Sequence, residues 1–321
     1  MSDPKIIATA LRTIQMEADS ISKLKEFVDA DFERALEVIA ASKGRLVVSG
    51  IGKSAIIAQK IVATFNSTGT PSIFMHAADA IHGDLGMMQQ DDIIIVISKS
   101  GDSPEIKVLV PLIKNFGNTL IGMVGNMDSF LARQSKIVLN TTIDQEACPN
   151  NLAPTNSTTA QMVMGDALAL CLMEMKGFEK ADFAKFHPGG ALGKRLFLRV
   201  SDLASQNEKP AVTAAASIRE VIVEMTRKRL GVTAVVDAED VIAGIITDGD
   251  LRRMLEKSDR FELLTAKDIM SDRPVTIEQD VLAVDALEIM KTKDISQLVV
   301  VDQTIYKGII HIHDIIKEGI I

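Results

Sequence analysis

Five short apolar runs alternate with helix-length segments between residues 46 and 139, and this alternation limits the choice of fold more than any other feature. The runs are Leu46–Ser49, Ser72–Met75, Ile93–Ser98, Leu120–Val124 and Ile137–Leu139. Continuous apolar runs of this length are typical of parallel strands that are buried on both faces. The segments between them include Ser54–Phe65, Ser103–Phe116 and Ser129–Gln134. Strands and helices in this order predict an α/β fold with a doubly wound, parallel, five-stranded sheet.

Amphipathic segments precede and follow the predicted sheet. Apolar residues recur near helical spacing from Asp3 to about Val28, and again from Phe32 to Ala41. A long apolar helix is predicted from about Thr158 to Met175, after a polar run that begins at Thr155. We therefore expect helices at both ends of the first domain.

An internal repeat follows Arg199. Each copy contains a short strand, a helix and a further strand, and the copies end with Gly244–Asp250 and Gly308–Asp314. Two copies in the same order predict a tandem module of α+β domains. The expected domains are residues 1–199, 200–264 and 265–321.

Charge and composition exclude several classes of protein. The chain has 35 Lys and Arg against 43 Asp and Glu, a net charge of -8, which argues against nucleic acid as a partner. No apolar stretch is long enough to span a membrane, and no secretory leader pattern is present. The two cysteines, Cys148 and Cys171, form no disulfide framework. We expect a cytoplasmic protein that has no membrane partner.

The first glycine loop, Gly50-Ile51-Gly52-Lys53-Ser54, lies between a predicted strand and a predicted helix. Such a turn lets the backbone approach an anion at the helix N-terminus. A nucleoside-triphosphate loop is excluded, because Val47 stands where that motif needs glycine. A dinucleotide fingerprint fits the glycine spacing, but the second strand ends at Met75 and His76 without the required acidic residue. A plain tight turn remains the structural alternative.

A second loop, Ser98–Glu105, follows the third predicted strand and contains three hydroxyl side chains around Gly101. Simple N-capping by Ser103 would explain that serine but not Ser98 or Ser100. Both loops lie at the carboxyl ends of strands, where open α/β sheets bind ligands. We therefore predict that this loop binds a phosphate monoester.

The motifs together resemble the sugar isomerase (SIS) domain family. The resemblance depends on both loops, on Glu146–Thr159, on His82–Gly86 and on the closing His187–Gly193. Within that family, the last two motifs are similar to those of the arabinose 5-phosphate isomerases. The tandem repeat resembles a pair of cystathionine β-synthase (CBS) domains. These resemblances cover nearly the whole chain.

The resemblance implies an aldose-ketose isomerase that interconverts D-ribulose 5-phosphate and D-arabinose 5-phosphate, and so supplies the precursor of Kdo for lipopolysaccharide. Matching by motif gives four candidate catalytic residues: Lys53, Glu105, Glu146 and His187. The candidate substrate contacts are Ser49, Gly50, Gly52, Ser54, Gly69, Thr70, His76, His82, Ser98, Ser100, Gly101, Ser103, Thr142, Asp144, Ser157 and Thr158.

Isomerisation through an enediol needs a base and stabilisation of negative charge on oxygen. His187 is the first choice for the base, because imidazole titrates near neutral pH. Glu105 or Glu146 is the alternative if burial raises the carboxyl pKa. Lys53 would polarise the carbonyl group or bind an oxygen of the intermediate.

No cofactor is expected to be required. In the family, His76 also lies at a metal-binding position, so zinc could bind there as an inhibitory or adventitious ion without a catalytic role. We expect a homotetramer, because the amphipathic N-terminal helices offer faces for other copies of the chain.

The tandem repeat contains a stretch similar to the CBS nucleotide signature, with Thr247, Asp248 and Asp250 as weak candidates. The second copy departs from it at His311, so an adenine nucleotide, a pathway product or dimerisation alone remain alternatives for the pair. For the whole chain, the alternative function is a non-catalytic phosphosugar sensor, although such sensors usually contain a basic helix-turn-helix segment that is absent here.

Overall fold

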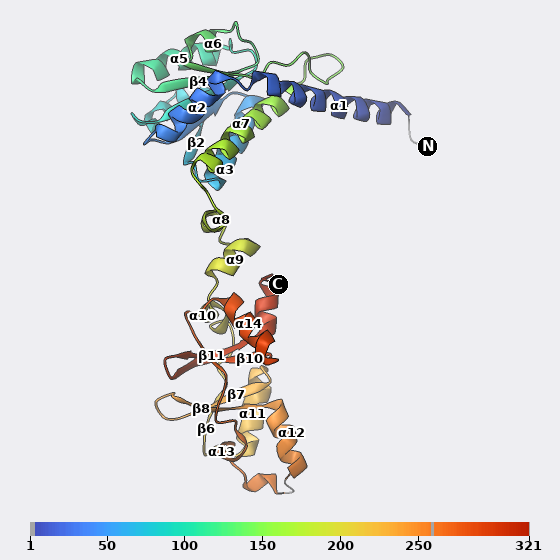
Figure 1. The fold of residues 1–321 in the computed structure, drawn as a ribbon, viewed down its shortest axis with the longest axis vertical. Coiled ribbons are helices and arrows are strands. Elements are labelled where there is room, and N and C mark those ends of the chain that lie inside the picture. The colour runs from blue at the N-terminus through green and yellow to red at the C-terminus, as the bar shows by residue number, and fades with distance from the viewer. Residues whose placement is uncertain (1–3, 258–259, 321) are drawn as a thin grey trace. The chain divides into compact units, whose positions relative to one another are not determined.

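In the computed structural model, which describes residues 4–257 and 260–320, a five-stranded parallel sheet lies at the centre of the first of two units, Met1–Phe186 (Figure 1). The strand order is β2-β1-β3-β4-β5. The strands are β1 (Leu46–Gly50), β2 (Ser72–His76), β3 (Ile93–Ser98), β4 (Thr119–Val124) and β5 (Ile137–Asn140). The predicted doubly wound sheet is confirmed, and each strand agrees with its apolar run to within a residue.

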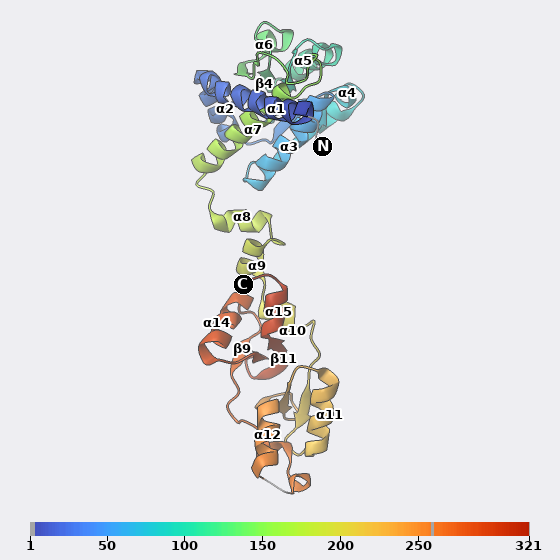
Figure 2. The same ribbon diagram turned by 90° about the vertical axis from the view of Figure 1, so that its right-hand side faces the viewer.

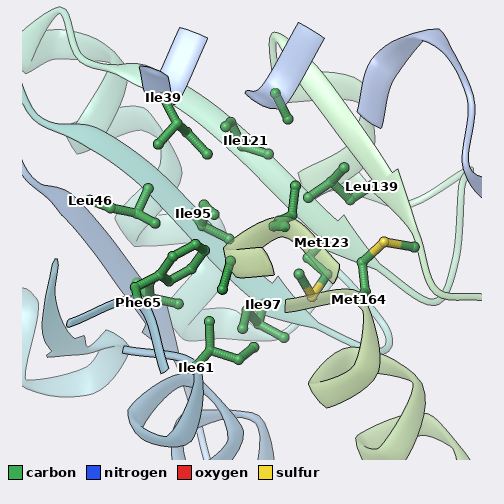
Figure 3. Packing of buried hydrophobic residues seen from close by; sticks show 14 of the residues in the cluster. Ile39, Leu46, Ile61, Phe65, Ile95, Ile97, Ile121, Met123, Leu139 and Met164 are labelled. Carbon is green, nitrogen blue, oxygen red and sulfur yellow. The ribbon is translucent and has the colours of Figure 1, made fainter. Parts of the chain in front are cut away.

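Helices cover both faces of this sheet. One face packs against α2, α3 and α7, and the other against α4, α5 and α6. Their bounds are α2 (Ala30–Ala41), α3 (Lys53–Ser67), α4 (Ala77–Ala80), α5 (Pro104–Phe116), α6 (Phe130–Gln134) and α7 (Asn156–Met175). Figure 3 shows Ile95 of the sheet beside Phe65 of α3. Burial on both faces explains why the strands are almost wholly apolar.

The helices α3 and α7 lie side by side and approach each other closely (Figure 1). Gly165 of α7 makes this approach possible, because a Cβ atom there would lie 2.4 Å from Cδ1 of Ile61. Both helices begin at the edge of the sheet where β1 and β3 end. Their packing therefore sets the distance between two helix N-termini at that edge.

An apolar stripe on α1 (Pro4–Lys23) has no partner within the described part of the chain. Ile7, Leu11 and Ile14 are each more than half exposed. In Figure 1, α1 reaches beyond the sheet of its unit. The helix ends earlier than predicted, and the chain continues as a short 3-10 helix, η1 (Leu24–Phe27), before α2.

The segment between β2 and β3 contains α4 and the 3-10 helix η2 (Asp84–Met87), neither of which was predicted. Each is four residues long, too short for a helical period to show in the sequence. Two further helices were also not predicted: α8 (Lys180–Phe186) and α9 (Ala191–Phe197).

The second unit, His187–Ile321, contains the repeat as two three-stranded sheets of order β6-β7-β8 and β11-β10-β9. Each sheet has one parallel and one antiparallel pair. In the second copy, α14 and α15 lie beside each other (Figure 2). The first copy contains β6 (Ala211–Thr213), α11 (Ile218–Lys228), β7 (Val232–Val236), β8 (Ile242–Thr247) and α12 (Asp248–Lys257). The matching elements of the second are β9 (Thr276–Glu278), α14 (Ala283–Lys293), β10 (Gln297–Asp302), β11 (Ile305–His311) and α15 (Ile312–Lys317).

Short helices precede each copy, namely α10 (Val200–Ala204) in the first, and η3 (Phe261–Leu263) and α13 (Ala266–Ile269) before the second. The repeat predicted from the sequence is confirmed, whereas the domain limits at residues 199 and 264 stay predictions.

Tyr306, the only tyrosine of the chain, is fully buried in this unit and donates a hydrogen bond to the Pro210 carbonyl at 2.9 Å. Among the helices of residues 4–257 and 260–320, none is long and apolar enough to cross a membrane.

Candidate active site

A cavity of about 330 Å³ opens where β1 and β3 end and α7 begins. Three segments that are far apart in the sequence form its wall: the two predicted loops, and the first turn of α7 with Pro154 just before it. The lining residues are Ile51, Lys53, Ser54, Ser98, Lys99, Ser100, Ser103, Pro154, Ser157 and Thr158. This position matches the general rule that open α/β sheets bind ligands at the carboxyl ends of their strands.

The first loop turns sharply from β1 into α3. A Cβ atom on Gly50 would lie 2.9 Å from the carbonyl group of Ser54, and Gly52 has a φ of +56°, so both positions favour glycine. Lys53 follows at the start of α3 and is exposed to the cavity. Of the carboxylates in the described residues, none forms an ion pair with Lys53. An unpaired cation at a helix N-terminus suits an anionic ligand.

The second loop is held in shape by its own hydroxyl groups. Ser98 Oγ accepts a hydrogen bond from the Gly101 N–H at 3.0 Å, and Ser103 Oγ accepts one from the Ile106 N–H at 3.4 Å. Ser103 is thus the N-cap of α5 as well as a residue of the cavity wall. Gly101 has a φ of +65°, and a Cβ atom there would lie 2.2 Å from Oγ of Ser129. Only glycine fits this turn.

The carboxylate of Glu146 is buried beside the cavity and accepts hydrogen bonds on both oxygens. Oε1 accepts from Lys99 Nζ at 2.6 Å and Ser157 Oγ at 2.5 Å. Oε2 accepts from the backbone N–H groups of Thr155 and Ser157, at 2.8 and 3.2 Å, and from the Thr155 hydroxyl at 3.2 Å. The residue is only 1% exposed.

These bonds decide the charge of Glu146. Burial alone raises the carboxyl pKa, but the hydrogen bonds from Lys99, Ser157 and the backbone outweigh this effect and lower the pKa to about 2. The condition under which Glu146 would serve as a base, a pKa raised by burial, is therefore not met. Its carboxylate is ionised throughout the neutral range.

Two polar residues of this region were not among the predicted contacts. Lys99 lines the cavity, and Gln161 of α7 accepts a hydrogen bond from Ser54 Oγ at 3.1 Å. Lys99 could have been found as the only cation of the second loop. Gln161 gives no sequence signal, because its role depends on the packing of α7 against α3.

Gly69 and Thr70 are not brought to this cavity. They precede β2, at the amino edge of the parallel sheet, whereas both loops follow the carboxyl ends of strands. At that edge, Lys176 Nζ donates to the Gly69 carbonyl at 3.2 Å and to Thr70 Oγ1 at 2.8 Å.

His76 and His82 flank α4 and do not line the cavity wall. His76 Nδ1 lies 3.5 Å from an Asp79 carboxylate oxygen, and His82 is exposed. Within the part of the chain that the structure describes, no three His, Cys, Asp or Glu side chains converge as a metal-binding set.

Four further predicted residues do not line the cavity. Ser49 is buried at the end of β1, and Glu105 is half-buried in the first turn of α5. Thr142 Oγ1 donates to Asn140 Oδ1 at 2.6 Å and lies 3.1 Å from the Gly125 carbonyl oxygen. Asp144 is exposed and pairs with Lys23 at 2.5 Å.

His187 belongs to the second unit, where its carbonyl oxygen accepts a hydrogen bond from the Gly190 N–H at 3.1 Å. All residues of the cavity wall described above belong to the first unit. The role of His187 as a base therefore stays a prediction.

A larger cavity, of about 790 Å³, lies between the two copies of the repeat in the second unit. Of the predicted nucleotide residues only Asp248 lines it, together with His311, His313, Asp314 and Lys317 of the second copy. Asp250 instead accepts hydrogen bonds from the backbone N–H and hydroxyl of Thr247 at 2.8 and 2.7 Å and pairs with Arg253 at 2.6 Å. The departure at His311 thus lies in the wall of the large cavity.

The fold and these two cavities define a SIS-domain protein with a tandem CBS module. The SIS domain model matches residues 39–171, and the CBS domain model matches residues 200–257 and 266–320. The chain is 46% identical to arabinose 5-phosphate isomerase KdsD of Pseudomonas aeruginosa, over 98% of this chain and 97% of the relative. It is 42% identical to KdsD of Escherichia coli K12, over 96% of this chain and 94% of the relative. The chain belongs to the arabinose 5-phosphate isomerase family.

A solved structure is also similar to the first part of the chain. The Escherichia coli CFT073 protein c3406, solved in complex with arabinose 5-phosphate, is 39% identical and has a TM-score of 0.55. The similarity covers 59% of this chain and all of that protein.

Proposed function

We propose that the protein is an aldose-ketose isomerase that interconverts D-ribulose 5-phosphate and D-arabinose 5-phosphate through an enediol. The observation that supports this most is the cavity at the carboxyl ends of β1 and β3, where a lysine and several serine hydroxyls converge. Its charge and donors suit a phosphorylated sugar. The names of the near full-length relatives favour the same activity over a non-catalytic sensor.

The chemical steps need a base, a proton shuttle and a donor toward the developing enediolate. His187 is proposed as the base, with Glu105 as the alternative. Lys53, a cation of the cavity wall, is proposed to bind the carbonyl oxygen and to stabilise the charge that develops on it. The ionised Glu146 is a poor base at neutral pH.

The isomerase is proposed to act in the cytoplasm and to supply the precursor of Kdo for lipopolysaccharide. No metal is proposed to take part in the reaction, and zinc at His76 would bind without a catalytic role. The isomerisation transfers no electrons to a partner, so it needs no redox cofactor.

The chain is proposed to assemble as a homotetramer. The exposed stripe of Ile7, Leu11 and Ile14 on α1 supports this, because an apolar helix face is stabilised when another copy covers it. The cavity between the CBS copies is proposed to bind an adenine nucleotide or a product of the pathway.

The decisive experiment is to incubate the purified protein with ribulose 5-phosphate and to identify the aldose that forms. Arabinose 5-phosphate is the expected product. Ribose 5-phosphate would contradict the proposed substrate, and the absence of turnover together with tight binding of the sugar phosphate would support the sensor.

A further inference from the structure

Lys99 is a cation of the cavity wall to which the proposed mechanism gives no role. Lys99 lies between Ser98 and Ser100 in the second loop, and 44% of its side chain is exposed. We propose that Lys99 binds the phosphate group of the substrate and that Glu146 acts as a positioning residue for this lysine. The proposal rests on the proposed isomerase function, because it assigns the phosphate of that substrate to a named side chain.

The position of the Lys99 side chain is fixed at both ends. At the backbone, the Gly125 N–H donates to the Lys99 carbonyl at 3.1 Å. A Cβ atom on Gly125 would lie 3.2 Å from Lys99 Cγ, so the glycine leaves room for the aliphatic chain. At the other end, Glu146 Oε1 accepts from Nζ at 2.6 Å. A lysine held at both ends loses less side-chain entropy when it binds an anion.

The ammonium group of Lys99 has N–H donors that are not used within the described residues. It has three N–H groups, and Glu146 is the one acceptor that the described residues provide for it. Both carboxylate oxygens of Glu146 are already fully used as hydrogen-bond acceptors, because Ser157 and Thr155 also donate to them. The carboxylate therefore holds the lysine, and the lysine presents its other donors to the cavity.

The cationic donors at the cavity also favour this assignment. A phosphate monoester has a charge of about -1.5 to -2 near neutral pH. Lys53 and Lys99 place two cationic donors beside the same loop, and because the Glu146 carboxylate offsets one charge, Lys99 adds hydrogen-bond donors rather than net charge. The Glu146 anion lowers the net charge of the empty cavity and so reduces the repulsion between the two lysines.

The alternative is that Lys99 only neutralises a buried carboxylate and never meets the substrate. Both roles would make Lys99→Met less stable, so stability cannot separate them. Phosphate affinity can separate the two roles, because only the proposed role predicts that phosphate binding depends on the Lys99 ammonium group. The double variant Lys99→Met with Glu146→Gln removes both charges and so leaves no buried, unpaired carboxylate behind.

The first test compares Lys99→Met with Lys114→Met, a matched control at the far end of α5 whose ammonium contacts Gln134. Calorimetry with inorganic phosphate measures affinity even if turnover were absent, so a failure of the proposed function would not hide the result. A charge-assisted hydrogen bond predicts a loss of roughly 10- to 100-fold in phosphate affinity for Lys99→Met. An equal rise in the KM for ribulose 5-phosphate is expected, with kcat within about threefold.

The second test is a double-mutant cycle on the same titration. Glu146→Gln should weaken phosphate binding in the wild-type background but cause no further loss in the Lys99→Met background. Lys99→Arg should restore part of the affinity, because it retains a cation that Glu146 can hold. An unchanged phosphate affinity in the folded Lys99→Met variant, or in the double variant, would overturn the role of Lys99. Equal losses from Glu146→Gln in both backgrounds would overturn the positioning role of Glu146.

Discussion

Replacing Glu146 with glutamine should make the stability of the first unit depend less on pH. The folded carboxyl has a pKa of about 2, against 4.5 without the surrounding protein. A carboxyl whose pKa is lowered by folding stabilises the protein above its unfolded pKa, and this contribution disappears as the pH falls through its folded pKa. The shift corresponds to about 3 kcal/mol at pH 7 and about 1.5 kcal/mol at pH 3. Glutamine keeps an acceptor oxygen but has no charge to titrate.

The assay is urea unfolding of wild type and Glu146→Gln at several pH values between 7 and 3. Far-UV circular dichroism follows both units, whereas tyrosine fluorescence reports only the second, because Tyr306 is the single tyrosine and the chain has no tryptophan. The transition that tyrosine fluorescence does not show therefore belongs to the first unit. Glu37→Gln, on an exposed position of α2, is the matched control.

The expected result is that the stability difference between wild type and Glu146→Gln falls by about 2 kcal/mol from pH 7 to pH 3. The amide of glutamine beside Lys99 adds a destabilising contribution that does not change with pH. A difference that stays constant over this range would refute the reasoning, because it would mean that the hydrogen bonds do not lower the pKa of Glu146.

Three further predictions concern the site directly. Gly101→Ala should lower kcat/KM at least tenfold, since its Cβ atom would clash with Ser129, whereas Gly177→Ala, which has a similar φ but open space, should cost only about 1 kcal/mol of stability and leave kcat/KM unchanged. His187→Ala should lower kcat by about 10² to 10⁴ in a folded protein if His187 is the base, and intact turnover would remove it from the mechanism. Activity should survive a chelator, so a complete loss that a divalent ion restores would contradict the absence of a metal requirement.

The sequence was enough to predict the sheet, because strands buried on both faces are apolar at almost every position. Ile93–Ser98 shows this most clearly, since all six of its residues are buried. The short helix α4 could not be predicted, because four residues contain only about one helical turn. The end of α1 was also missed, since the apolar spacing continues into η1 while the hydrogen bonding changes.

The site was harder to predict than the fold. Gly50, Gly52 and Gly101 were recognisable because a turn next to a strand end needs glycine. The protonation state of Glu146 was not, because it depends on donors from Lys99 and Ser157, which are 47 and 11 residues away in sequence. The position of Gly69 and Thr70 at the amino edge of the sheet could not be predicted either, since a motif match gives no information about which edge of the sheet a residue occupies.

The close packing of Gly165 against Ile61 has a consequence for the site, although neither residue lines it. Lys53 opens one of the two packed helices, and Ser157 lies in the first turn of the other. A larger side chain at residue 165 would separate the helices and move these two groups apart. The proposed alignment of Lys53 with the rest of the site therefore depends on how these two helices pack, and we predict that a larger side chain at residue 165 lowers turnover before it unfolds the protein.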